Sequence, residues 1–351
     1  MDQNFKPRDD EGFSMLELMI ALTVMLVLAG ASIALMRDSL KVAVATYELT
    51  DAQEALRTAQ EYVNRDLINA GDGLNSLSNI HVTSNFKTNY ISKDTSVDVD
   101  HFGILTSDDN VPAGTTILGA SPATTVRSTP NVTDRISILA RDASFNNGAP
   151  VTPVSVDSTG TNIQVAAGEE SKFVTGEVYF LSSSAGATFC TITSITGVGT
   201  TTPKLVFANG DTFGLNVTGT TGLVRTIANG GATSLVRMQI IHYYVNSNGL
   251  LMRRVFGVKG TGFTESPIAE HIVALQFRYV LDMVDGSGYV VQPTRQLTST
   301  QQTATRQVEV TVTAETPHSM AGMQNGGSPQ LTMTTSTSVR NMQFKQALQP
   351  S

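Results

Sequence analysis

The sequence predicts an α+β protein in which a long N-terminal helix packs against a mainly antiparallel, β-rich head. The first observation behind this is an almost wholly apolar run at residues 13–36, which continues into a segment with helical spacing. The second is the change of composition after Gly73, where Thr, Ser, Gly and Val dominate and short strand-forming runs alternate with turns. The chain has 351 residues, which is enough for a sizeable hydrophobic core.

The apolar run at residues 13–36 is long enough to cross a membrane. As a helix it reaches about 36 Å, against a hydrocarbon core of about 30 Å. Glu17 is the one charged residue inside it. A carboxylate within a membrane disfavours insertion by about 3 kcal/mol, so Glu17 indicates a function and needs a partner. A secretory signal peptide fits less well, because the run is too long and no small-residue cleavage site follows it.

Cleavage between Gly12 and Phe13 would supply a partner for this carboxylate. The new amine of Phe13 would be a cation at the helix start, and positions i and i+4 of a helix are neighbours. We therefore expect Glu17 to reach the amine of its own chain or of an adjacent subunit. At about 4 Å and an effective dielectric constant near 20, the pair attracts by about 4 kcal/mol, comparable with the cost of burying the acid. An ordinary signal anchor, which needs no cleavage, is the alternative.

The helical pattern continues through residues 37–70. Apolar residues recur every three or four positions there: Leu49, Ala52, Leu56, Ala59, Val63, Leu67 and Ala70. Gly71 and Gly73 then provide a C-terminal stop. One helix over residues 13–70 is therefore predicted, with this stripe as the face against which a sheet packs.

The head is predicted to contain several hairpins. Residues 236–257 form two strands around an Asn248-Gly249 turn, and residues 271–291 form two strands that turn at residues 285–288. Further strands are predicted at residues 134–141, 305–316 and 329–343. The sparsely charged stretch of about residues 143–233 reads as a small β module inserted into the main sheet.

The composition excludes several classes of function. A formal net charge of −7 argues against nucleic acid, and the single cysteine, Cys190, rules out an intrachain disulfide. Cys190 lies in an apolar stretch and is expected to be a small buried side chain, and His242 is expected at a sheet surface. The acidic turns at residues 98–103 and 282–288 lack EF-hand spacing. We expect no catalytic site, cofactor or metal, and the chain is predicted not to be an enzyme.

The segment Gly12-Phe13-Ser14-Met15-Leu16-Glu17 resembles the class III signal of type IV prepilins. The resemblance implies cleavage after Gly12 by a prepilin peptidase, N-methylation of Phe13, and registration of each subunit against its neighbour by Glu17. Two features depart from the family. The leader, residues 1–12, is net acidic, and Ala34 stands where many major pilins have a proline. The second departure favours a minor pilin or pseudopilin over a major pilin.

Head segments extend the resemblance to the PilW family of minor pilins. These segments are "NRDLINAG" (64–71), "DRISILA" (134–140), "NGLLMRRV" (248–255), "ALQFRYVLD" (274–282) and "SVRNM" (338–342). The resemblance implies a type IV pilin-like fold with three parts. They are a leader at residues 1–12, a pilin helix at residues 13–71 whose part 13–36 is transmembrane, and a globular head at residues 72–351.

The resemblance also implies a role in assembly. Such a protein joins other minor pilins and the major pilin, primes or caps the pilus, and supports adhesion or motility. It would sit in inner-membrane lipid with a periplasmic head, move to the pilus tip after assembly, and have a tip adhesin as a further partner. Two alternatives stay open: a J-like pseudopilin of a type II secretion system, and a pilin-anchored surface protein whose head binds a ligand or glycan.

Overall fold

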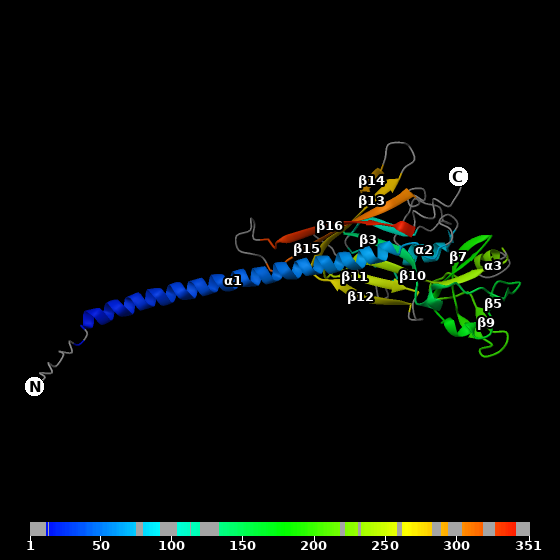
Figure 1. Ribbon diagram of the computed structural model, residues 1–351, viewed down its shortest axis with the longest axis horizontal. Helices are drawn as coiled ribbons and strands as arrows, with labels where there is room; N and C mark the ends of the chain where they lie inside the picture. Colours follow the sequence, from blue (N-terminus) through cyan, green and yellow to red (C-terminus); the bar gives the residue numbers. More distant parts are fainter. Residues whose placement is uncertain are drawn as a thin grey trace, which may run out of the picture. The chain divides into compact units, whose positions relative to one another are not determined.

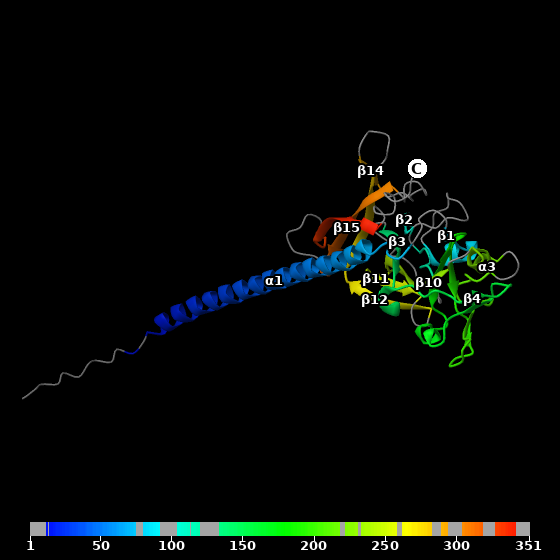
Figure 2. The ribbon, with the colours of Figure 1, turned by 45° about the vertical axis from the view of Figure 1, so that its right-hand side comes forward.

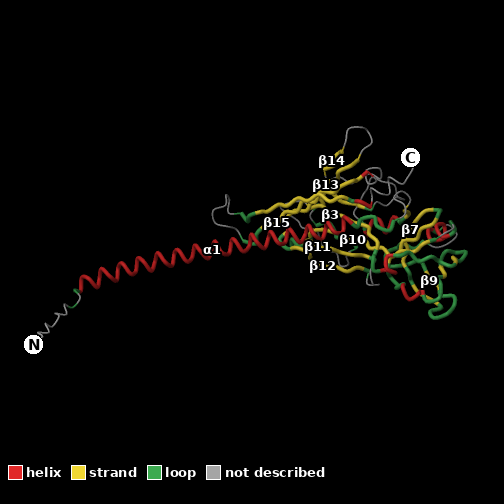
Figure 3. Tube along the Cα trace, in the orientation of Figure 1, coloured by secondary structure: helices red, strands yellow, loops and turns green. Residues whose placement is uncertain are grey.

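A computed structural model describes most of the chain. The described residues are 12, 14–74, 80–91, 104–112, 114–119, 133–217, 222–230, 233–257, 262–282, 289–293, 304–318 and 327–341. The chain divides into two units, Met1–Asp51 and Ala52–Ser351, and the helix α1 (Met15–Ile68) has residues in both (Figure 1). The second unit is built mainly of strands (Figure 3). The predicted α+β class is confirmed.

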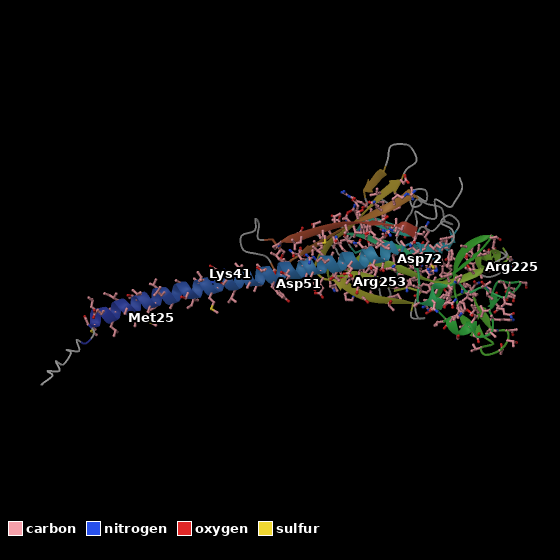
Figure 4. All side chains as sticks on the ribbon, in the orientation of Figure 1. Met25, Lys41, Asp51, Asp72, Arg225 and Arg253 are labelled. Atoms are coloured by element: carbon pink, nitrogen blue, oxygen red, sulfur yellow. The ribbon has the colours of Figure 1, made fainter. Side chains whose placement is uncertain are left out.

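In the first unit α1 is a helix with exposed apolar side chains. Met25 is 72% exposed and Leu26 67% exposed, and Met25 is labelled in Figure 4. Among the described residues, α1 is the one helix long and apolar enough to cross a membrane. The predicted helix over residues 13–70 is thus confirmed with slightly shorter limits, and Phe13 lies outside the described residues.

In the second unit α1 buries one stripe of small and apolar side chains. As predicted, the stripe contains Ala52, Leu56, Ala59, Val63 and Leu67, each at most 5% exposed. These side chains join the largest hydrophobic cluster of the head, with residues from the sheets. Burying side chains such as Leu56 stabilises the fold by about 2 kcal/mol each, so this stripe is a main support of the helix.

The end of α1 is fixed to the head by its stop signal. Gly71 has φ = 76°, which favours glycine, and its N–H donates to the carbonyl of Leu139 at 2.8 Å. Beyond it, the Asp72 carboxylate accepts from Arg141 at 2.9 Å. The predicted C-terminal stop therefore also attaches the end of the helix to the strand β3 (Thr133–Arg141).

The main sheet has eight strands, and β10 (Ser234–Val245) is its centre. The order is β1 (Ile80–His81), β7 (Gly186–Thr191), β6 (Val178–Ser183), β10, β11 (Leu251–Phe256) and β12 (Phe263–Ala269), with β2 (Leu105–Val111) and β3 off this path. One side of β10 pairs first with β6 and then with β11, and the other side pairs with β3. The β1–β7 pair is parallel, whereas the other pairs in this sheet are antiparallel.

The predicted hairpin at residues 236–257 is confirmed by β10 and β11. Their register pairs Val245 with Leu251, and Gly249 between them has φ = 75°. The Asn246 side chain accepts from the N–H groups of Asn248 and Leu250, both at 3.0 Å. Local turn chemistry therefore sets this connection, as the Asn-Gly pair indicated.

A second, four-stranded sheet has the order β14 (Tyr289–Pro293), β13 (Ile272–Asp282), β15 (Thr305–Glu315) and β16 (Gln330–Ser338). All its pairs are antiparallel, and β14 and β15 are labelled in Figure 2. The strands predicted at residues 271–291, 305–316 and 329–343 are thus confirmed. The turn predicted at residues 285–288 lies outside the described residues.

A third, small sheet has the order β4 (Ser155–Val156), β5 (Asn162–Gln164), β9 (Lys204–Val206) and β8 (Ser194–Thr196). It shares a separate hydrophobic cluster, between Phe145 and Leu235, with side chains of β6 and β7. Short helices accompany these elements: α2 (Ser84–Tyr90), α3 (Leu223–Ala228), η1 (Phe145–Gly148) and η2 (Glu169–Lys172). Because β6 and β7 belong to the main sheet, the limits of the module proposed at about residues 143–233 stay a prediction.

His242 corrects one expectation. It lies in β10 as predicted, but its side chain is fully buried and not at a sheet surface. Residues 114–119 lie over this part of the sheet, since the buried Arg135 and Arg254 donate to the carbonyls of Thr116 and Leu118. Residues 114–119, which lie outside the helices and named strands, therefore cover the part of the sheet that contains His242.

Candidate functional site

The start of α1 carries a reciprocal pair of caps. Ser14 precedes the first helical residue, and its hydroxyl accepts from the N–H of Leu16 at 3.3 Å. The Glu17 carboxylate reaches back and accepts from the N–H of Ser14 at 3.2 Å. This is a variant of the capping box, in which the serine accepts from the N2 instead of the N3 N–H, and two N–H groups without helical partners are both satisfied. Local sequence alone therefore sets the beginning of the helix at Met15.

Glu17 lies at the N-terminal end of an exposed apolar face. Ala21, Val24 and Leu28 follow it at helical spacing and line the same side of α1. A carboxylate in the first turn is favoured by the partial positive charge of the helix N-terminus. In this unit Glu17 is thus held by its own chain, while the face beside it remains open.

Two of the predicted site residues, Gly12 and Glu17, lie at this helix start. Gly12 is exposed, and in the part of the chain that the structure describes no atom beyond its chain neighbours would lie within 4 Å of a Cβ placed on it. Phe13 lies outside the described residues, so the expected contact between its amine and Glu17 stays a prediction. Sequence reasoning had not used Ser14, although the S-x-x-E spacing of Ser14 and Glu17 is a readable signal for a capping box.

Comparison with protein families decides the class of this segment. Residues 7–33 match the model of the prokaryotic N-terminal methylation motif, a range that includes Gly12, Phe13 and Glu17. The chain carries a prepilin-type signal. Together with α1, this signal supports a type IV pilin-like, membrane-anchored, single-pass protein, either a pilin or a pseudopilin. Comparison with curated proteins and with solved structures found no match.

The head of this pilin-like protein offers little reactive chemistry in the part that the structure describes. No group of three or more His, Cys, Asp or Glu side chains there is placed to hold a metal ion. Cys190 is fully buried, as expected, and burial raises the pKa of its thiol. Burial and the nearby Arg135 and Arg254 hold the pKa of His242 well below its usual value, so its imidazole is neutral.

One carboxyl group of the head has a strongly shifted pKa. Burial raises the pKa of Asp134 to about 7, and the neighbouring Asp109 and Asp108 add to the shift. The N–H groups of Asn110 and Phe277 donate to this carboxyl, both at 2.9 Å, and oppose the shift. These bonds join the bulge of β2 to β13, so we interpret Asp134 as a structural link between the two larger sheets.

Proposed function

We propose that this protein is a minor pilin of a type IV pilus, which co-assembles with other minor pilins to prime or cap the filament. The observation that carries the proposal is a single helix, Met15–Ile68, that begins within the matched motif, directly after the expected cleavage position between Gly12 and Phe13. The first part of this helix exposes apolar side chains, and its last part belongs to the core of the head. One element thus serves as membrane anchor and as the support of the head.

Glu17 would register the subunit in the membrane. In the unprocessed chain its carboxylate accepts from Ser14, which reduces the cost of placing a charge in lipid. After cleavage the amine of Phe13, on the same or an adjacent subunit, would offer a full positive charge. At about 4 Å that pair attracts by about 4 kcal/mol at an intermediate dielectric constant, more than a neutral N–H donor contributes.

Two properties support a minor over a major subunit. Ala34 lies within the unbroken helix α1, at a position where many major pilins carry a proline. The head is also large, with three sheets and a second hydrophobic cluster. The proposed partners are other minor pilins, the major pilin and a prepilin peptidase, and a location at the pilus tip follows if this subunit caps the assembly.

Two measurements test the proposal. Amino-terminal sequencing of the protein from membranes should find Phe13 as the first residue, and Gly12→Val should leave an uncleaved precursor. Deletion of the gene should abolish surface pili and leave protein secretion normal. Normal pili with failed secretion would assign the protein to a type II secretion pseudopilus, and an unprocessed wild-type chain would contradict both assignments.

A further inference from the structure

We propose that the open edge of β16 binds an extended, uncharged strand of a neighbouring pilin-like subunit. β16 ends the order β14-β13-β15-β16, and the described part of the chain adds no strand beyond it. The proposal rests on the proposed function, because assembly from a common membrane is what brings a second head beside this edge.

The register of β16 shows which backbone groups are open. At one end the N–H of Val339 donates to the carbonyl of Arg306, and at the other the N–H of Thr316 donates to the carbonyl of Pro329, both at 3.0 Å. In an antiparallel ladder, hydrogen-bonded and non-bonded pairs alternate. The odd-numbered residues of β16 are therefore the ones whose backbone groups bond to β15.

The backbone N–H and C=O groups of the even-numbered residues of β16 point away from β15. The N–H and C=O groups of Thr332, Thr334 and Ser336 face the side on which no strand is described. These groups repeat every second residue, which is the spacing that an added strand needs. The edge thus offers a preformed row of donors and acceptors.

This edge lacks the features that usually prevent strand addition. At the end of the main sheet, β12 contains Pro267, and proline opposes pairing with another chain. β16 has nine residues, "QLTMTTSTS", with neither proline nor charge. An edge strand of this length without charged residues can pair with a strand of another chain unless a partner already covers it.

The side chains of β16 define the chemistry of the partner. One face presents exposed hydroxyl and amide groups, as at Thr332 and Ser336, and the other presents Leu331 and Met333, which are half-buried against the main cluster. An added strand would continue both faces if it alternates small polar and apolar residues. A charged residue on its inner face would lie against Leu331 and Met333 and lose hydration. The occupant is therefore uncharged and alternating.

The test uses the full-length protein in detergent micelles and a synthetic peptide of the sequence QLTMTTSTS as the probe strand. We expect the amides of Thr332, Thr334 and Ser336 to exchange rapidly in the free protein and at least about tenfold more slowly with saturating peptide. Thr334→Pro removes an N–H that β15 does not use, so it should preserve the fold and abolish peptide binding.

Two matched variants show whether peptide binding depends on the backbone of this edge. Thr335→Pro removes the N–H opposite Val310 and should destabilise the sheet, which checks the assigned register. Arg278→Ala changes an exposed side chain of β13, which β15 separates from β16, and should therefore leave peptide binding unchanged. Equal peptide binding by wild type and Thr334→Pro, or loss of binding in Arg278→Ala, would overturn the proposal.

The identity of the partner is tested in cells with a photo-crosslinking residue at Thr332. The expected product is a protein that itself carries a prepilin-type signal, identified by mass spectrometry. A product without such a signal, or crosslinking only to a second copy of this chain, would overturn the assignment of the occupant. Amides of β16 that are already protected in the free monomer would show that the edge is covered within the chain. None of these outcomes depends on cleavage after Gly12, so failure of the proposed function is recognised separately.

Discussion

Asp66 on α1 and Arg253 on β11 form a salt bridge, with Arg253 Nε 2.6 Å from Asp66 Oδ2. The same carboxylate oxygen accepts from the hydroxyl of Tyr243 at 2.7 Å. Only 6% of the Asp66 side chain is exposed, against 20% for Arg253, which is labelled in Figure 4. The contact attaches the last turns of the helix to the β10–β11 hairpin. If either side chain of the ion pair were removed, the other would be left buried without a charged partner.

Removal of this carboxylate should therefore be costly. Asp66→Ala leaves the guanidinium of Arg253 and the hydroxyl of Tyr243 without their acceptor, and we expect the free energy of unfolding to fall by about 2–4 kcal/mol. The control is Glu169→Ala, which removes a more exposed partner of Lys172 and should cost less than about 1 kcal/mol. Urea unfolding followed by circular dichroism measures both, and equal losses would contradict the assigned role.

Asp134 should make the stability of the head depend on pH. Its pKa is raised to about 7 in the fold from an ordinary 3.8, so the folded state binds this proton more tightly than the unfolded state. The contribution is fully present below about pH 4 and is lost as the pH rises through about 7, by at most about 1.4 kcal/mol per pH unit.

The measurement for Asp134 compares slopes. Urea unfolding at several pH values between about 4 and 8 should give a wild-type stability that falls more steeply with pH than that of Asp134→Asn. The variant itself is expected to be less stable throughout, because its amide N–H₂ replaces one carboxyl oxygen and meets the N–H of either Asn110 or Phe277. Parallel curves for the two proteins would show that Asp134 does not titrate in this range.

Periodicity and turn chemistry were enough to predict much of this fold. The stripe from Ala52 to Leu67 and the alternation in β15 each have one buried face, and the Asn-Gly turn after β10 is a local signal. His242 was placed wrongly because its cover, residues 114–119, comes from a segment far away in the sequence. Burial by a segment that is distant in the sequence does not produce a periodic pattern of apolar residues in the strand itself.

The candidate site was predictable for a different reason. Gly12 and Glu17 are close in sequence and belong to a short signal, so their proximity follows from helix geometry. The ion pairs that hold the head together, such as Asp66 with Arg253, join residues far apart in the chain. Their charges were visible in the sequence, but their pairing depends on how the helix and the sheet meet.

A strained backbone position offers a further test. His271 has φ = 57°, a left-handed conformation that costs a non-glycine residue about 1–2 kcal/mol. It lies where the chain leaves β12 and enters β13, and its carbonyl accepts from the N–H of Glu315 at 2.9 Å. His271→Gly should therefore raise the free energy of unfolding, by about 0.5–1 kcal/mol after the greater entropy of unfolded glycine is subtracted.

The neighbouring residue supplies the control for His271. Glu270 precedes it in the same connection without a left-handed φ, so Glu270→Gly should lower the free energy of unfolding by about 0.5–1 kcal/mol. Opposite signs for the two glycine variants in urea unfolding are the expected result. A loss of stability in both would show that the His271 side chain contributes more than its backbone strain costs.

The capping box makes it possible to separate the charge of Glu17 from its hydrogen bond. In Glu17→Gln the amide oxygen can still accept from the Ser14 N–H, so the helix start is kept while the negative charge is lost. Ser14→Ala does the reverse: it removes the hydroxyl cap on Leu16, at a cost of about 1 kcal/mol, and keeps the carboxylate. Glu17→Ala removes both functions.

If Glu17 registers subunits through its charge, the Gln and Ala variants should both lose association with partner pilins, by about tenfold or more, and Ser14→Ala should keep it. All three should insert and be cleaved after Gly12, since the two Glu17 variants lose a charge, which eases partition into lipid, and Ser14→Ala leaves the charge as in the wild type. Co-purification of full-length proteins from membranes measures association, amino-terminal sequencing checks processing, and circular dichroism checks the fold. Normal association of Glu17→Gln beside failure of Glu17→Ala would instead show that the carboxylate acts as a helix cap. If the protein caps the filament, no subunit lies above it, so blocking the Phe13 amine should be tolerated while Glu17→Gln is not.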